Sequence, residues 1–160
     1  MSDAISIRPA LESDLPALGK LGAVLIDTHY RFDPQRFMAP GDRTDEGYAW
    51  FLGTQLGEAD VIVLVAAQRG SVVGYVYAGL EPQSWKELRD ACGFIHDIVV
   101  DERGRRGGVA TALIDAAAEW LRAHGAPRVV LWTAQHNEGA QRLFERLGFR
   151  RTMVEMTREL

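Results

Sequence analysis

Apolar side chains recur with two different periods in the first half of the chain. Residues 5–9 alternate apolar and polar side chains and end in a proline, which predicts a short strand. Leucines then recur at helical spacing, so we expect one helix from Ser13 or Asp14 to about residue 30 and another from about residue 44 to residue 56. Continuous, β-branched apolar runs predict strands at residues 61–68, 72–80 and 94–100, with a tight turn at 69–71 and a loop containing a helical turn at 81–92.

In the second half of the chain, predicted strands alternate with predicted helices. An alanine-rich amphipathic segment predicts a helix over residues 109–124 that ends before Gly125. Further patterning predicts a strand at 128–133, a short helix at 137–147 and a last strand at 149–158. This order indicates an α/β domain with at least one parallel crossover. We find no internal repeat and no long linker, so we expect a single domain over residues 1–160.

Composition narrows the function classes. Apolar residues make up 47% of the chain, and charged residues 25%, as in ordinary globular domains. The net charge of −4 argues against a nucleic-acid partner bound by general phosphate neutralisation. Cys92 stands alone, and no His or Cys pattern suggests a metal site, so a reducing compartment is expected. The apolar run at 61–67 is far shorter than the roughly 18 residues of a membrane span, and the N-terminus lacks a signal pattern, which predicts a cytoplasmic protein.

The most informative segment is the turn between the predicted strand at 94–100 and the helix that follows. Gly107 and Gly108 permit backbone angles that other residues avoid, and Arg105 and Arg106 add positive charge. The free N–H groups and the dipole at a helix N-terminus favour an anion by up to about 2 kcal/mol. The turn therefore suits a pyrophosphate, although it matches neither the nucleoside triphosphate loop nor the dinucleotide fingerprint. Composition alone equally allows a solvated loop.

The run from Ile98 through Leu113 resembles the acetyl-coenzyme A signature of the GNAT superfamily of N-acetyltransferases, with Arg105, Gly108 and Ala110 at its three fixed positions. Residues 137–149 resemble the C-terminal helix and turn of that family. The resemblance implies a central mixed sheet of about six to seven strands flanked by about four helices. It implies acetyl-coenzyme A (acetyl-CoA) as co-substrate, no metal, and a coenzyme site at Ile98, Val99, Val100, Arg105, Arg106, Gly107, Gly108, Val109, Ala110, Thr111, Asn137 and Phe144.

Acetyl transfer to an amine needs a proton acceptor, because an amine with a pKa near 10.4 is protonated at neutral pH. The resemblance points to the strand at 94–100, where several similar enzymes carry an acidic residue at the position of His96. His96 can serve as a base, whereas Asp97 is chemically closer to that carboxylate and can attract a cationic substrate. Both reach one site only if the strand is bulged, as the strand of this family usually is. The resemblance also implies the backbone N–H of Val99 as the oxyanion donor. A structural role for His96 or Asp97 stays open.

Phe144 is a second departure, because many relatives carry a tyrosine that protonates or orients the leaving sulfur. Packing explains Phe144 more simply, and water, Tyr75 or Tyr77 can take over that role. On the acceptor side, the resemblance implies substrate contacts from Tyr30, Phe32, Trp85 and Asp97. An aromatic residue at helical spacing more often belongs to the core.

Two functions remain open at this stage. The first is an enzyme that moves an acetyl group from acetyl-CoA directly to a primary amine of a small molecule or peptide, through a ternary complex. A covalent route through Cys92 is disfavoured, because no matched His and Asp or Asn pattern accompanies it. The second is a non-catalytic acyl-CoA sensor or interaction module, motivated by His96 and Phe144. A last strand ending at Leu160 would be able to pair with a second subunit and form a homodimer.

Overall fold

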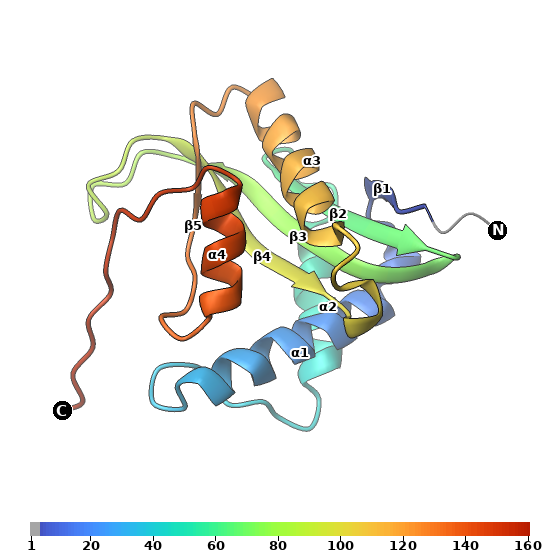
Figure 1. Cartoon of the computed structure of the whole chain (residues 1–160), viewed down its shortest axis with the longest axis horizontal. Coiled ribbons are helices and arrows are strands. Elements are labelled where there is room, and N and C mark those ends of the chain that lie inside the picture. The colour runs from blue at the N-terminus through green and yellow to red at the C-terminus, as the bar shows by residue number, and fades with distance from the viewer. Residues whose placement is uncertain (1–3) are drawn as a thin grey trace.

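The computed structural model describes residues 4–160, which form one five-stranded sheet with helices on both faces (Figure 1). Its strands follow the chain order across the sheet. The first four strands form an antiparallel meander, and the fifth pairs with the fourth in parallel. The strands are β1 (Ser6–Pro9), β2 (Val61–Gln68), β3 (Ser71–Glu81), β4 (Cys92–Val100) and β5 (Val129–Leu131). The mixed α/β sheet is therefore confirmed.

The sheet has fewer strands than the six to seven that we expected, because residues 149–158 form no strand. A strand needs a neighbouring edge for its backbone hydrogen bonds. Side chains of this tail instead bind elsewhere: Arg151 pairs with Glu145 at 2.8 Å, and Glu155 pairs with Arg36. The tail leaves the body of the molecule after the last helix (Figure 1). Residues 149–160 therefore offer no strand that could pair with a second subunit, and formation of a homodimer stays a prediction.

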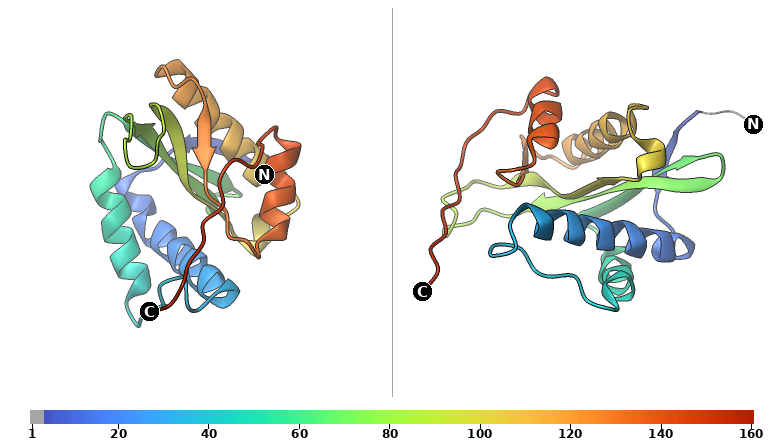
Figure 2. Two further views of the ribbon diagram at one scale, coloured as in Figure 1. Left: turned by 90° about the vertical axis from the view of Figure 1, so that its left-hand side faces the viewer. Right: turned by 60° about the horizontal axis from the view of Figure 1, so that its bottom comes forward.

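The helices cover the sheet in two layers. Figure 2 shows α1 (Leu15–Phe32) and α2 (Thr44–Gln55) on one face, and α3 (Val109–Ala123) and α4 (Glu138–Arg146) on the other. Short 3-10 turns, Glu12–Asp14 and Glu102–Gly104, precede α1 and α3. No helix within residues 4–160 has the length and apolar content to cross a bilayer.

A separate hydrophobic cluster lies on each face of the sheet. Leu113 and Leu121 of α3 pack on Val76 of the sheet and are fully buried. On the opposite face, Leu18 of α1 and Leu52 of α2 are equally buried against Tyr75 and other sheet residues. Each fully buried leucine contributes on the order of 2 kcal/mol relative to exposure. The sheet is thereby held between two helix layers, which fixes the position of β4.

Two further predicted features need correction. The loop at 81–92 contains no helical turn: a bridge between Ser84 and Arg89 closes a tight turn there, and the guanidinium of Arg89 donates to the carbonyls of Pro82 (3.3 Å) and Asp90 (3.0 Å). These bonds satisfy the backbone without a helix. Asp14 stands at the start of α1, but its carboxylate turns back to Arg8 at 2.7 Å and to the N–H of Leu11 at 2.8 Å, so it does not cap α1.

The parallel pairing of β4 and β5 is short. Gly93, Phe94 and Ile95 of β4 pair with Val129, Val130 and Leu131, and β4 then continues to Val100 while β5 ends. The two strands separate beyond this point (Figure 1). The edge of β4 from His96 to Val100 that faces away from β3 is therefore left without a strand partner in the described part of the chain.

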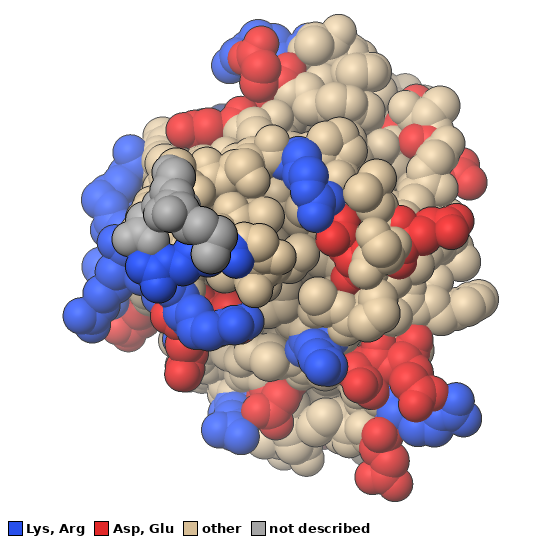
Figure 3. Space-filling view, turned by 90° about the vertical axis from the view of Figure 1, so that its right-hand side faces the viewer, with Lys and Arg blue, Asp and Glu red and all other residues tan. Residues whose placement is uncertain are grey.

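Charges are separated on the side of the molecule that lies at the right of Figure 1. Basic side chains gather along one margin of this face, and acidic side chains predominate along the other (Figure 3). A net charge of −4 is thus spread unevenly over the surface.

Candidate active site

The turn before α3 has the backbone geometry of an anion site. Gly108 stands at the start of the helix with a φ of 77°, in the left-handed region that glycine tolerates. Its carbonyl accepts the first helical hydrogen bond, from the N–H of Ala112 at 3.0 Å. Residues 105–108 are exposed. The N–H groups of the first helical turn, which have no carbonyl partner within the helix, therefore open toward solvent at this turn.

The arginines of this turn have different surroundings. Arg103 is paired with Asp101 at 2.7 Å, and this hydrogen-bonded ion pair lowers the pKa of the Asp101 carboxyl. The Nε of Arg105 donates to the carbonyl of Val100 at 3.3 Å, which ties its side chain to the end of β4. Arg105 and Arg106 carry charges that no carboxylate within residues 4–160 pairs by an ion pair. The turn therefore presents net positive charge to an anion.

The expected bulge in β4 is present beside the separation of β4 and β5. Ile95 pairs with Ala78 and Asp97 pairs with Tyr77, so His96 is an extra residue on β4. The extra residue reverses the alternation of side chains, and His96 and Asp97 both project to the face that carries α1 and α2. Contacts confirm this, because the ring of His96 meets that of Tyr77 and the carboxylate of Asp97 meets Tyr75.

Asp97 is enclosed by two tyrosines. Its Oδ2 accepts hydrogen bonds from the hydroxyl of Tyr75, at 3.0 Å, and from the hydroxyl of Tyr48. Burial raises the pKa of Asp97, although both hydrogen bonds act in the opposite direction. Burial and the neighbouring carboxylate also raise the pKa values of Tyr48 and Tyr75, so both phenols stay protonated and act as donors. The trio holds one acidic group in a partly buried position.

A glycine on α1 makes room for this arrangement. A Cβ on Gly22 would lie 2.1 Å from the ring of Tyr48, far inside van der Waals contact. One turn earlier, a Cβ on Gly19 would lie 2.3 Å from the carbonyl oxygen of Asp45. The two glycines allow α1 and α2 to approach closely, and this approach brings the Tyr48 hydroxyl to Asp97.

His96 has a different environment from its neighbour. Its ring is stacked on Phe94 and tilted against Tyr77, with centroids 4.8 Å apart in each case. Its Nε2 lies 3.1 Å from Oε1 of Glu81, and 29% of the side chain is exposed. His96 is therefore held in one orientation but remains accessible, unlike a core histidine.

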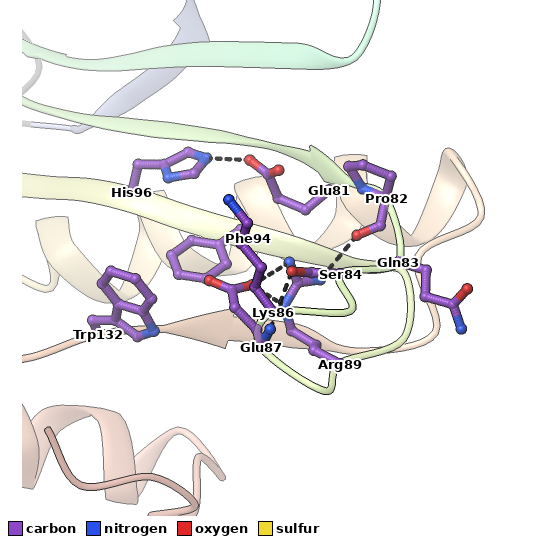
Figure 4. Close-up of a pocket in the computed structure, with 10 residues that line it drawn as sticks. All are labelled: Glu81, Pro82, Gln83, Ser84, Lys86, Glu87, Arg89, Phe94, His96 and Trp132. Atoms are coloured by element: carbon purple, nitrogen blue, oxygen red, sulfur yellow. Dashed lines mark hydrogen bonds and ion pairs between the residues drawn. The ribbon is translucent and has the colours of Figure 1, made fainter.

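A pocket of about 480 Å³ opens between His96 and the hairpin that joins β3 to β4. The hairpin between β3 and β4 forms one wall, and Trp132, directly after β5, stands on the opposite side (Figure 4). The rings of Phe94 and Trp132 meet edge to face with centroids 5.4 Å apart. The lining residues are Glu81, Pro82, Gln83, Ser84, Lys86, Glu87, Arg89, Phe94, His96 and Trp132.

The other predicted coenzyme residues lie in three places. Ile98, Val99 and Val100 occupy the part of β4 beyond its pairing with β5, and the Val99 side chain is buried, so only its backbone is available to a ligand. Asn137 caps α4 by accepting from the N–H of Ala140 at 3.2 Å. Phe144 is 6% exposed and packs in the core, with its ring 5.9 Å from that of Phe149. A packing role accounts for Phe144.

The aromatic residues expected to bind the acceptor do not meet at the pocket. Tyr30 and Phe32 lie at the end of α1, where the Phe32 ring contacts that of His29 at 5.9 Å. Trp85 projects from the hairpin tip and is 86% exposed. Neither these residues nor Asp97 line the pocket beside His96. Their substrate contacts stay a prediction.

Sequence reasoning did not find Glu81, Phe94 or Trp132, which surround His96 in the structure. Glu81 lies fifteen positions before His96 and joins it only through the register of β3 with β4, so no local spacing signals the pair. Within residues 4–160, no group of three or more His, Cys, Asp or Glu side chains is placed to hold a metal ion.

Comparisons with known proteins agree with this architecture. Residues 25–149 match the model of the Acetyltransferase (GNAT) family. An uncharacterized N-acetyltransferase of Methanocaldococcus jannaschii is 38% identical over 53% of this chain and 37% of its own length. A mycothiol acetyltransferase of Amycolatopsis mediterranei is 27% identical over 94% of this chain and 48% of its own length. The chain thus spans less than half the length of these curated relatives.

Solved structures share the fold at low sequence identity. A mutant of a Bacillus halodurans protein superposes with a TM-score of 0.80 at 22% identity, over 97% of this chain and 99% of that one. An aminoglycoside N-acetyltransferase in complex with CoA gives a TM-score of 0.76 at 19% identity, over 100% of this chain and 97% of that one. At these identities the likeness establishes a common fold.

Proposed function

The chain belongs to the GNAT family of acetyltransferases, and on that premise we propose that it moves an acetyl group from acetyl-CoA directly to a primary amine in a ternary complex. The observation that carries this proposal is the free edge of β4. It runs from the bulge at His96 toward the exposed turn at Gly108, so it links a group able to accept a proton to a site suited to a pyrophosphate.

In this proposal the coenzyme binds mainly to backbone. Its pyrophosphate occupies the start of α3, where free N–H groups and the charges of Arg105 and Arg106 favour an anion. Its pantetheine arm follows Ile98 to Val100, whose outer edge offers backbone donors and acceptors. The CoA complex of the aminoglycoside N-acetyltransferase with this fold supports the choice of donor.

The transfer is a direct displacement. The amine nitrogen attacks the thioester carbonyl, the backbone N–H of Val99 stabilises the oxyanion, and the coenzyme leaves as a thiolate. A donor aimed at the developing charge contributes about 3 kcal/mol. A thiol with a pKa near 8.5 leaves readily at neutral pH, so the reaction tolerates Phe144 in place of a side-chain acid.

The acceptor is proposed to be a small-molecule or peptide amine. The pocket beside His96 has a suitable size, and the carboxylate of Glu81 at its wall attracts an ammonium group. An aminoglycoside acetyltransferase from an uncultured soil metagenomic sample has the same fold, and its structures with trehalose and with sisomicin support a small-molecule acceptor.

Calorimetric titration with acetyl-CoA, compared with dephosphorylated pantetheine, tests the coenzyme site. We expect micromolar or tighter binding that requires the pyrophosphate. A single-turnover assay with a panel of amines then tests transfer. Binding without consumption of acetyl-CoA would favour the non-catalytic acyl-CoA module, which His96 and Phe144 motivate. Absence of binding by the folded protein would overturn the proposed function.

A further inference from the structure

We propose that Glu81 is a positioning residue that makes His96 the proton acceptor for the incoming amine. This inference rests on the proposed acetyltransferase function and deepens it, because the sequence leaves the choice between His96 and Asp97 open. Three observations carry the assignment: the clamped ring of His96, its contact with Glu81, and its place at the pocket wall.

The ring of His96 has little rotational freedom. Phe94 and Tyr77 flank it with both centroids at 4.8 Å, and the interplanar angles are 19° and 32°. Tyr77 is itself anchored, since its hydroxyl donates to Oε1 of Gln55 at 3.0 Å. A ring held in this way presents each nitrogen in a fixed direction, which proton transfer at a defined atom requires.

The contact with Glu81 favours one tautomer. Nε2 lies 3.1 Å from Oε1 of Glu81, within ion-pair distance, and a carboxylate oxygen can only accept, so the contact favours a neutral His96 with its hydrogen on Nε2 (Figure 4). The lone pair is then on Nδ1, which has no hydrogen-bond partner among the side chains that the structure describes. The same carboxylate stabilises the imidazolium that forms when Nδ1 takes a proton.

Asp97 is poorly placed for this role. Two phenol hydroxyls already donate to its Oδ2, and it does not line the pocket. His96 is the first residue of β4 after the last pair with β5, and it lines the pocket together with Trp132, the first residue after β5. An amine that enters this pocket meets His96 at the point where the strands separate.

The remaining charged groups of the pocket do not compete for His96. Arg89 is paired with Glu87 at 2.7 Å, and Lys86 can only donate. Glu81 is therefore the carboxylate that faces the ring, while the hydroxyl of Tyr77 is directed to Gln55.

The proton balance of the step is simple. The ammonium form of the acceptor gives one proton to Nδ1, which passes it to water. The neutral amine then attacks: the C–N bond forms, the C–S bond breaks, and the electron pair leaves with sulfur. The second nitrogen proton moves through Nδ1 to the thiolate. One acetyl amide, one free thiol and one released proton result.

Kinetics of matched variants tests the assignment. We expect His96→Gln, which keeps a planar polar side chain, to lower kcat about 100-fold while acetyl-CoA affinity stays unchanged. The deficit should shrink for acceptor amines of lower pKa, which need less help to lose a proton. Glu81→Gln keeps an acceptor for Nε2 but removes the charge, and should lower kcat about 10-fold with little change in KM. Glu119→Gln on α3, whose partner is Arg122, is the control and should match the wild type.

Long-range ¹H–¹⁵N NMR of the free protein gives a readout that does not depend on turnover. The His96 signal, assigned by its loss in His96→Gln, should report the tautomer protonated on Nε2 in the wild type and in Glu81→Gln. It should report a mixture in Glu81→Ala. A wild-type ring protonated on Nδ1, or full kcat in Glu81→Gln, would overturn the proposal. Failure of acetyl transfer with the expected tautomer present would instead count against the proposed function alone.

Discussion

The two sides of the candidate active site are built from different materials. The proposed coenzyme side is backbone: an exposed turn in which Gly108 adopts a left-handed conformation and opens the start of α3. The proposed acceptor side is made of side chains from separate elements, because Glu81, His96 and Trp132 come from β3, β4 and the segment after β5. A site made of backbone groups is specified by consecutive residues. The geometry of a site made of side chains depends on strand register and on the packing of separate elements.

Glycines mark the same difference. Gly108 is required by its φ of 77°, which other residues rarely adopt. Space is not the reason, because a Cβ there would meet nothing within 4 Å. Gly22 is required by space, since a Cβ there would collide with the ring of Tyr48. Substitutions at these two positions should therefore fail for different reasons, one in ligand binding and the other in folding stability.

The largest effect is expected from Gly108→Glu. The new carboxylate repels the pyrophosphate at the start of α3, and the side chain strains a left-handed residue. We expect acetyl-CoA affinity to fall at least about 100-fold, which corresponds to about 2.7 kcal/mol, by calorimetric titration.

Gly57→Glu is the matched control for that variant. Gly57 also has a positive φ, 87°, and open space around its Cβ position, but it lies between α2 and β2. The same strain and charge are thus introduced away from the turn. Equal loss of acetyl-CoA affinity in both variants would show that strain or charge in general, and not the turn, is responsible.

Gly22→Ala should lower the free energy of unfolding by about 2 kcal/mol, because the α1 and α2 interface is too tight for a methyl group. Chemical denaturation measures this effect. In contrast, Gly47→Ala on the exposed side of α2, where a Cβ meets nothing, should raise stability by about 0.5–1 kcal/mol. Two variants of equal stability would mean that the close helix contact is not essential to the fold.

The smallest effect, on the order of 1 kcal/mol, is expected from Asp97→Asn and depends on pH. Burial raises the pKa of Asp97 in the folded chain, so the folded state binds the proton more tightly than the unfolded state. This contribution to stability is complete below the unfolded pKa and is lost as pH rises through the folded pKa. The amide side chain of the Asp97→Asn variant does not titrate, so the variant does not lose this stability as pH rises.

Thermal melting of wild type and Asp97→Asn between pH 4 and pH 8 checks the sign. The variant should gain stability relative to the wild type as pH rises. A difference between the two melting temperatures that stays constant with pH would contradict the raised pKa of Asp97.

Most secondary structure could be predicted, because each element carries its own signal. The strand at 61–68 and the start of the helix at residue 109 match the structure, since an unbroken apolar run and a glycine turn are local features. The strand predicted at 149–158 is wrong, because local sequence does not decide whether a strand forms. Its composition allows a strand, but strand formation depends on an edge that the tail does not reach.

In the candidate site, too, only the features made by consecutive residues could be predicted from the sequence. The turn at 105–108 was visible in sequence because its glycines and arginines are adjacent. The bulge at His96 was expected only through family resemblance, and the structure contains it. The contacts of His96 with Glu81 and of Asp97 with Tyr48 arise from residues 15 and 49 positions apart, so only the folded chain reveals them.

The bulge in β4 has a consequence for how such a site can change over time. Because His96 is the extra residue, it occupies no paired position in the register with β3. A substitution there changes a side chain at the pocket wall, whereas the hydrogen bonds that hold Asp97 come from Tyr48 and Tyr75. Position 96 is thus a place where the side chain at the pocket can change while the paired positions of β3 and β4 stay the same.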